Sequence, residues 1–235
     1  MLFSSVTFLY LFLPFTIFLY YFVPQKGRNF VLFVMSLFFY AWGEPVYVFL
    51  MLAQIVISYV LLWLMDRFRI LYILSVLLPF MALFYFKYYN FFMETVFGMK
   101  VKAVPLPVGI SFYTFQIVSY CIDVHRGRVK RQKNFITYAA YVTLFPQLVA
   151  GPIVRYSEIE QTLTHGTDFS DIHVNFERGV VRFAVGLGKK VLIANVIGEF
   201  VAEIAALGQR NLTLSWAYAI AVALQIYFDF SGYSD

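Results

Sequence analysis

Polar side chains stand in or beside long apolar runs of the sequence, where they could line a path for a substrate. Gln116, Ser119 and Asp123 are spaced by three and four residues, so a helix would place them on one face. Gln225 and Asp229 would likewise share a face of a second helix. In lipid, polar groups are costly and normally point into a helix bundle or a wet cavity. The alternative for each is a hydrogen bond that joins two helices, and Asp123 and Asp229 also lie near enough to segment ends to reach lipid headgroups.

Two segments, 105–123 and 141–155, contain prolines and glycines that a straight helix would not tolerate. A proline inside a helix removes a hydrogen bond and forces a kink, which lipid tolerates only where protein or a polar cavity covers the freed carbonyl. We therefore expect both segments to be broken or re-entrant helices that line a cavity. Gln147 and Arg155 join the residues that could line it. Ordinary kinked helices are the alternative interpretation.

The histidines form no recognised catalytic or metal-binding pattern. His165, Asp168, Asp171 and His173 match no known metal-ligand spacing, so we predict no metal site. His125 lies in a basic loop and is expected at the surface. The sequence also has no nucleophile elbow and no phosphate-binding glycine loop.

The composition indicates where these polar residues lie. The 235 residues are 61% hydrophobic and 13% charged, whereas an average soluble domain is about a quarter charged. This excludes an ordinary soluble globule, the abundance of Phe and Tyr excludes a disordered chain, and the single cysteine excludes a disulfide scaffold. The net charge of +5 fits basic cytoplasmic loops of a membrane protein. We therefore expect a lipid bilayer as partner and no nucleic acid.

Long charge-free runs predict the membrane helices, because 18 helical residues rise about 27 Å, close to the thickness of the hydrocarbon layer. The runs are 6–23, 29–43, 45–65, 70–86, 103–122, 134–154 and 211–228. A further stretch, 176–201, is apolar but interrupted by charges, and we interpret it as a tilted or interfacial helix. The sequence therefore predicts one all-α domain over residues 1–235: a multipass integral membrane bundle of six to eight helices with broken or re-entrant segments.

Lysines and arginines cluster in three loops that are each separated by two predicted crossings. These loops hold Lys26 and Arg28, then Arg67 and Arg69, then five basic residues within 126–133. Because basic loops remain in the cytoplasm, the N-terminus is expected outside.

Several motifs together resemble the membrane-bound O-acyltransferase superfamily. They are "MLFSSVTFLYLFLPF", "SLFFYAWGEPVYVFL", "LPVGISFYTFQIVSYCIDVHRG", "FPQLVAGPIVRYSEI", "RFAVGLGKKVLIAN" and "QIYFDFSGYSD". They follow the family order and cover essentially the whole chain, which resembles the N-terminal part of such proteins. The first two motifs are more similar to the alginate O-acetylase branch than to the D-alanyl transferases of teichoic acid.

The resemblance, which is to a bacterial branch of the superfamily, implies an inner-membrane location, a reaction and a set of partners. Family members move an acyl group from a thioester to a hydroxyl through a tunnel, with an intramembrane histidine as general base. We therefore expect an acetyl-CoA-like donor as substrate, no bound cofactor, an extracytoplasmic acetyl-transfer partner protein, and a polysaccharide acceptor such as alginate. The resemblance places the catalytic histidine beyond residue 235, so we assign no catalytic residue in this chain and expect it to be inactive alone. Arg155 could hold a phosphate of the donor, or it could anchor a helix end.

Two other functions remain open from the sequence. A non-catalytic membrane partner or scaffold would need no histidine. A small multipass transporter would also have kinked helices and polar residues at membrane depth, although it would usually carry an inverted repeat, which we do not find.

Overall fold

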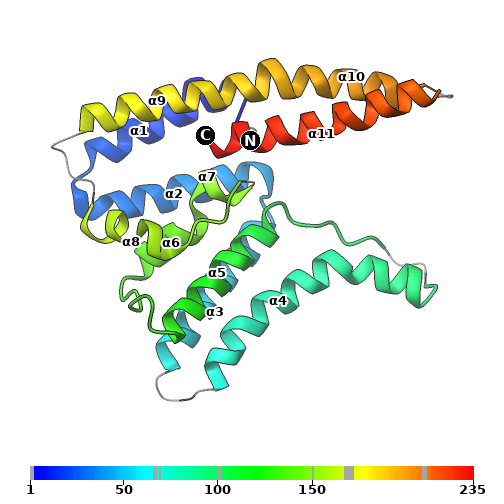
Figure 1. The fold of residues 1–235 in the computed structure, drawn as a ribbon. Helices are drawn as coiled ribbons and strands as arrows, with labels where there is room; N and C mark the ends of the chain where they lie inside the picture. Colours follow the sequence, from blue (N-terminus) through cyan, green and yellow to red (C-terminus); the bar gives the residue numbers. More distant parts are fainter. Residues whose placement is uncertain are drawn as a thin grey trace. The chain divides into compact units, whose positions relative to one another are not determined.

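The computed structural model describes residues 3–65, 68, 70–99, 102–149, 151–166, 172–207 and 211–235. This described part contains α-helices and short π-helical turns and no β-strand, so the all-α prediction is confirmed (Figure 1). The helices group into two compact units. The first unit contains Tyr10–Gly166, and the second contains Leu2–Leu9 with Thr167–Asp235. The single domain over residues 1–235 stays a prediction.

The first unit consists of a series of helices joined by short non-helical segments. Its elements are α1 (Leu13–Phe22), α2 (Gln25–Gly43), α3 (Tyr47–Leu64), α4 (Ile70–Phe91) with the π-turn η2 (Phe92–Val96), α5 (Ile110–His125), α6 (Phe135–Thr143), α7 (Phe145–Leu148) and α8 (Tyr156–His165). A π-turn, η1 (Phe8–Phe12), precedes α1. Helix α2 packs on α6, and α4 packs on both α3 and α5.

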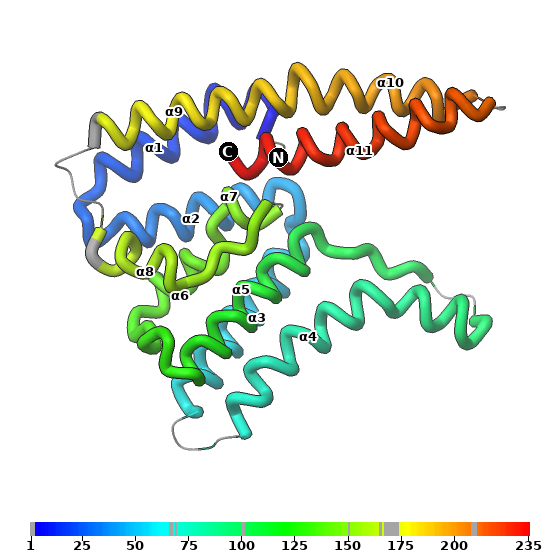
Figure 2. The backbone as a smooth tube through the Cα atoms, in the orientation of Figure 1, coloured from blue at the N-terminus to red at the C-terminus, as the bar shows by residue number. Residues whose placement is uncertain are grey.

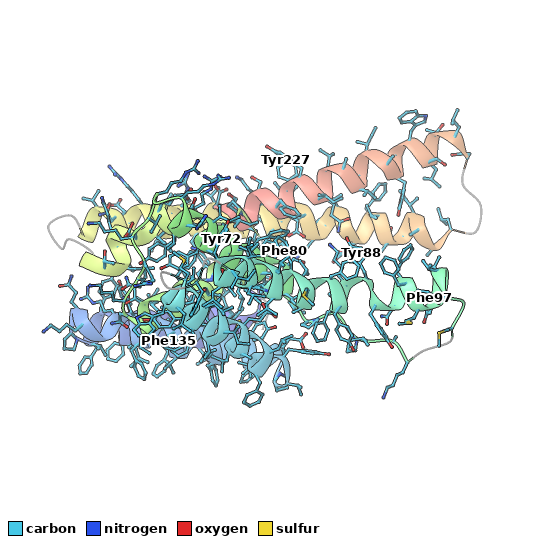
Figure 3. All side chains as sticks on the ribbon, turned by 90° about the horizontal axis from the view of Figure 1, so that it is seen from below. Tyr72, Phe80, Tyr88, Phe97, Phe135 and Tyr227 are labelled. Atoms are coloured by element: carbon cyan, nitrogen blue, oxygen red, sulfur yellow. The ribbon has the colours of Figure 1, made fainter. Side chains whose placement is uncertain are left out.

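Three helices in the described part are long and apolar enough to cross a membrane: Tyr47–Leu64, Ile70–Val96 and Leu212–Ser234. Much of their surface is apolar and exposed, and Figure 3 shows the side chains of Phe80, Tyr88 and Tyr227 on these helices. The predicted helix 6–23 is shorter in the structure, where the apolar helix covers Phe8–Phe22. The membrane character of the chain is therefore confirmed, and within the described ranges fewer helices reach the full length of a span than the charge-free runs predicted.

The two segments rich in proline and glycine are broken, as predicted. Residues 102–109 are not helical, and α5 begins only at Ile110. The prediction of one membrane helix over 134–154 is wrong, because the backbone leaves the helical conformation at Leu144, with ψ of 109°, and restarts as the four-residue α7. Pro146 lies in the first turn of α7, a position where its missing N–H removes no helical hydrogen bond.

Pro79 behaves differently, since it lies inside an uninterrupted α4. A proline at this position leaves the carbonyl of Ser75, four residues earlier, without its helical partner. The Cys121 thiol of α5 donates to that carbonyl, with an Sγ–O distance of 3.8 Å. A weak bond from a neighbouring helix therefore covers the group that the proline frees.

The first and third basic loops meet at one end of the first unit. Arg131 donates through Nη1 to the carbonyl oxygen of Leu62, at the end of α3, at 3.0 Å. Close by, Asn29 at the start of α2 donates to Thr137 Oγ1 of α6 at 3.0 Å and to the Leu163 carbonyl of α8 at 2.7 Å. The first and third basic loops thus lie together, as expected for loops on the same side of a membrane. The residues of the second loop, Asp66, Arg67 and Arg69, lie outside the described residues.

The second unit is a pair of long helices. α9 (Ile172–Gly188), the π-turn η3 (Lys189–Ala194) and α10 (Asn195–Ala206) form one continuous helical run. This run lies antiparallel to α11 (Leu212–Ser234), as Figure 2 shows. The expected helix over the charge-interrupted stretch 176–201 is confirmed.

Candidate functional site

The first candidate contact joins the two broken segments of the first unit. Gly109, with φ of +77°, precedes α5, and a Cβ atom on it would lie 2.5 Å from the carbonyl oxygen of Leu148 in α7. Only glycine allows both this conformation and this close approach. Farther along α5, Gln116 is 1% exposed, and its Nε2 donates to Oε1 of Gln147 at 3.1 Å. Two of the predicted lining residues are therefore brought together.

Some buried amide atoms near the centre of these helices lack hydrogen bonds. Within the described residues, Gln116 Oε1 and both amide atoms of Gln54 are buried with no hydrogen-bond partner. Leaving such groups unpaired is costly, so they mark positions where a polar ligand would be stabilised. Gln54 was missed by the sequence analysis. It could have been found as a glutamine within the otherwise apolar helix Tyr47–Leu64.

Asp123 lies in the last turn of α5 and contacts Arg128 of the third basic loop. It is 6% exposed, and its Oδ1 lies 3.7 Å from Nη1 of Arg128. The backbone N–H of Arg128 also donates to the Asp123 carbonyl at 2.9 Å. Asp123 shares the buried face with Gln116, as predicted, but their separation of seven positions corresponds to a rise of about 10 Å. The structure therefore does not bring Asp123 to the Gln116–Gln147 contact.

Arg155 immediately precedes α8, and its side chain is exposed. It lies at the opposite end of that helix from the carbonyl of Leu163, which bonds to α2. Within the described residues, no contact joins Arg155 to Gln116 or to Gln147. Its phosphate-binding role stays a prediction.

A cluster of buried tyrosines holds α5, α6 and α8 together. Its members, each at most 1% exposed, are Tyr120, Tyr138, Tyr141 and Tyr156. The ring centroid of Tyr120 lies 5.0 Å from that of Tyr138 and 4.9 Å from that of Tyr156. Gln132 donates through its backbone N–H to the Tyr120 hydroxyl at 2.7 Å and through Nε2 to the Tyr156 hydroxyl at 2.9 Å. Burial raises the pKa of Tyr156, so its phenol stays neutral and acts in packing.

The remaining predicted lining residues lie in the second unit. Gln225 and Asp229 share the face of α11 that packs on the α9–α10 run, which confirms their common face. Asp229 Oδ1 lies 2.7 Å from Nζ of Lys190. A Cβ atom on Gly198 would lie 2.8 Å from Nε2 of Gln225. Both side chains are therefore used in helix-to-helix contact within this unit.

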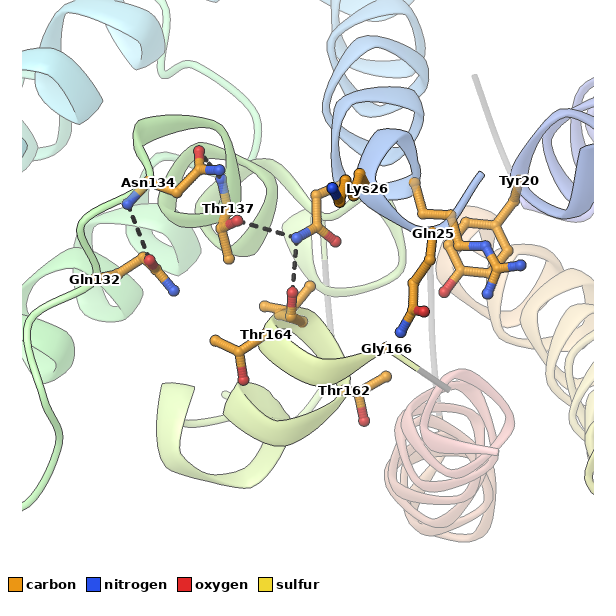
Figure 4. Close-up of a pocket in the computed structure, with 12 residues that line it drawn as sticks. Tyr20, Gln25, Lys26, Gln132, Asn134, Thr137, Thr162, Thr164 and Gly166 are labelled. Carbon is orange, nitrogen blue, oxygen red and sulfur yellow. Dashed lines mark hydrogen bonds between the residues drawn. The ribbon is translucent and has the colours of Figure 1, made fainter. Parts of the chain in front are cut away.

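A polar pocket of about 520 Å³ opens in the first unit where the basic loops meet (Figure 4). It is lined by the turn from α1 into α2, the turn into α6 and the end of α8. The lining residues are Tyr20, Gln25, Lys26, Arg28, Asn29, Gln132, Asn134, Thr137, Thr162, Leu163, Thr164 and Gly166. None of these described residues carries a carboxylate. The sequence analysis missed the pocket because its walls lie more than a hundred residues apart in the chain.

His125 is the histidine whose side chain the structure describes, and its described ring contact is with Tyr72 rather than with a predicted lining residue. His125 ends α5, is exposed as predicted, and stacks on the ring of Tyr72 with centroids 3.7 Å apart. Among the described residues no group of three potential metal ligands comes together. Asp168, Asp171 and the side chains of His165 and His173 lie outside the described residues.

Comparison with known proteins gives one matching family model. The model of the membrane-bound O-acyltransferase family matches residues 125–234. The match includes the third basic loop, the broken segment, α8 and nearly all of the second unit.

Curated relatives match the whole chain. A protein named "Probable alginate O-acetylase" from Pseudomonas aeruginosa is 38% identical over 254 residues, and the alignment covers 100% of this chain and 48% of the relative. A protein of the same name from Azotobacter vinelandii is 37% identical, with 100% and 50% covered. A peptidoglycan O-acetyltransferase from Helicobacter pylori is 31% identical, with 100% and 52% covered. The chain thus spans about half the length of the curated relatives it matches.

Proposed function

The chain belongs to the membrane-bound O-acyltransferase family, and on this premise we propose that it forms part of an O-acyltransferase that acetylates an extracytoplasmic polysaccharide such as alginate. The observation that carries the proposal is the similarity to alginate O-acetylases along every residue of the chain. The peptidoglycan relative supports the reaction class and leaves the glycan open to test.

The proposed reaction joins a hydroxyl oxygen to the acyl carbon of a thioester. A general base takes the hydroxyl proton, the oxygen attacks the thioester carbonyl, the carbon–sulfur bond breaks, and the departing sulfur is released as a thiol after protonation. The base expected from the family resemblance is a histidine beyond residue 235. The donor expected is an acetyl-CoA-like thioester, which is a substrate rather than a bound cofactor.

The proposed contribution of this chain is one wall of the acyl path. Gln116 and Gln147 are joined at 3.1 Å between two broken segments, and Gln116 keeps a buried oxygen without a partner in the described structure. Such an oxygen can accept a hydrogen bond from an acceptor hydroxyl and orient it. The apolar helices around it would exclude water, which would otherwise hydrolyse the thioester.

We propose a bacterial inner-membrane location with the N-terminus outside and the basic loops in the cytoplasm. The meeting of the first and third basic loops at one end of the first unit supports this orientation. The donor would then enter from the cytoplasmic side, and the acetyl group would pass to an extracytoplasmic partner protein. A periplasm-active reporter fused after Arg128 should be inactive, and strong activity there would contradict the orientation.

The test of function is a chimera. This chain replaces the matching segment of the Pseudomonas aeruginosa relative, and alginate acetylation is measured in a strain that lacks that relative. We expect acetylated alginate, and we expect no rescue when the chain carries Gln116→Leu and Gln147→Leu together. A parallel chimera with the Helicobacter pylori relative, read out as peptidoglycan acetylation, tests the acceptor class.

The controls concern insertion and folding. Membrane levels of each chimera are compared with those of the parent protein, and Tyr227→Phe serves as a matched variant on an exposed face of α11. A chimera that reaches parental levels in the membrane and transfers no acetyl groups to either glycan would contradict the proposed function.

A further inference from the structure

The polar pocket of the first unit has the charge and the donors of an anion site. Arg28 is 6% exposed and lines the pocket, and its guanidinium carbon lies 5.2 Å from the centre of the Tyr20 ring. Lys26 is exposed and lines the same pocket. Two cationic side chains thus face one polar space whose described lining contains no carboxylate. A buried guanidinium of this kind stabilises an anion strongly, because water screens it little.

The walls of the pocket are held in place by hydrogen bonds. Asn29 donates to Thr137 and to the Leu163 carbonyl, and so links α2 to α6 and α8. Asn134 accepts from the backbone N–H of Ile136 at 2.9 Å and so caps α6. A Cβ atom on Gly166, whose φ is +79°, would overlap the amide of Gln25. Three segments that are distant in sequence therefore form a preorganised site rather than a loose surface groove.

The start of α2 adds to the positive potential. α2 is 19 residues long, and Gln25, Lys26 and Arg28 occupy its first turn. The N-terminal end of a helix carries a partial positive charge, which favours an anion beside it. Basic residues in the first turn disfavour the helix by itself, and an anion bound beside them would offset this cost.

We propose that this pocket binds a phosphate ester, with Arg28 and Lys26 as its cationic contacts. Arginine matches the several oxygens of a phosphate by paired hydrogen bonds, and lysine adds a point charge. The volume of about 520 Å³ exceeds that of a bare phosphate and suits a headgroup or a small soluble ester. If the ester is coenzyme A, the site would hold the donor and this inference rests on the proposed function. If the ester is a lipid headgroup, the site is independent of the acyl transfer.

Two sources can supply a phosphate ester at this end of the first unit. One is a soluble molecule such as coenzyme A, and the other is the headgroup of an anionic phospholipid. The 235-residue chain is purified in detergent, and the shift of its unfolding temperature is measured with coenzyme A and with inorganic phosphate. In a second arm the chain is placed in nanodiscs of phosphatidylcholine with or without phosphatidylglycerol.

The variants separate the site from the general positive charge of the loops. Arg28→Gln should weaken binding of the stabilising probe about tenfold, because a charged hydrogen bond is lost. Lys26→Gln, which changes an exposed side chain and should fold normally, should weaken it about threefold. The matched control is Lys130→Gln, an exposed lysine of the third basic loop outside the pocket, which should leave binding unchanged.

The outcomes show whether the pocket binds a phosphate ester and which of the two sources supplies it. Stabilisation by coenzyme A and phosphate identifies a soluble ester, and stabilisation only by phosphatidylglycerol identifies a lipid headgroup. If no probe stabilises the chain, or if Lys130→Gln weakens binding as much as Lys26→Gln, the phosphate site is overturned. Acetyl transfer is not read out in this experiment, so its failure and the failure of the proposed function are distinguishable.

Discussion

The first unit buries whole aromatic side chains, whereas the second unit leaves most of its longest apolar helix exposed. Tyr120, Tyr138 and Tyr141 are at most 1% exposed between α5, α6 and α8. In contrast, only 6% of the most apolar window of Leu212–Ser234 is buried. The second unit is joined instead by close glycine contacts and ion pairs. The first unit therefore has a core of its own, and the second depends on lipid or further protein for its apolar surface.

The largest expected effect is the loss of a core tyrosine. Tyr120→Ala removes an aromatic side chain that contacts three other rings and accepts from Gln132, so it should lower the free energy of unfolding by about 3–5 kcal/mol. Tyr227→Ala, on the exposed side of α11, should change it by about 0.5 kcal/mol or less. Denaturant unfolding in detergent measures both. Equal effects would remove the contrast between the two units.

An intermediate effect is expected at the glycine crossing of the second unit. A Cβ atom on Gly186 would lie 2.5 Å from the carbonyl oxygen of Gly232, so Gly186→Ala should destabilise the helix pair by about 1–3 kcal/mol. Gly188 has open space, so Gly188→Ala should instead stabilise the helix by about 0.5–1 kcal/mol. The same unfolding assay compares the two variants. A neutral Gly186→Ala would show that the close approach is not needed.

The smallest effect is expected at the ion pair of Lys190 and Asp229. These side chains are 37% and 43% exposed, so Asp229→Asn should lower the free energy of unfolding by about 1 kcal/mol or less. The double variant Lys190→Met, Asp229→Asn should recover part of the loss, because the charge left without its partner is also removed. Glu203→Gln, at an exposed position of α10, is the control. A loss above that of Gly186→Ala would reverse the ranking of contacts in this unit.

Spacing in the sequence predicted the faces and the breaks of the helices. The shared faces of Gln116 with Asp123 and of Gln225 with Asp229 follow from helical periodicity, which is local. The breaks in segments 105–123 and 141–155 follow from their prolines and glycines. The apolar composition of 134–154, taken alone, predicted one membrane helix there. The non-helical backbone at Leu144 does not change the apolar composition of the run, so composition could not reveal it.

The pocket and the partners of each polar group could not be predicted in this way. Asn29 bonds to Thr137 and Leu163, and neither local periodicity nor composition relates positions so far apart. The same is true of Cys121 and the Ser75 carbonyl. Gln54 was visible in the sequence as a polar residue in an apolar run, but only the structure shows that its amide is buried. Side-chain pairing across helices is set by tertiary packing.

The burial of Cys121 makes the chain a convenient background for thiol labelling. It is the only cysteine among the 235 residues, it is 0% exposed, and its sulfur faces the carbonyl that Pro79 frees. A membrane-impermeant maleimide added to intact cells should therefore leave the unmodified protein unlabelled. Single cysteines introduced at Lys26, Lys130 or Glu44 would then be the sole reactive positions. Each could report its side of the bilayer without first removing the native thiol.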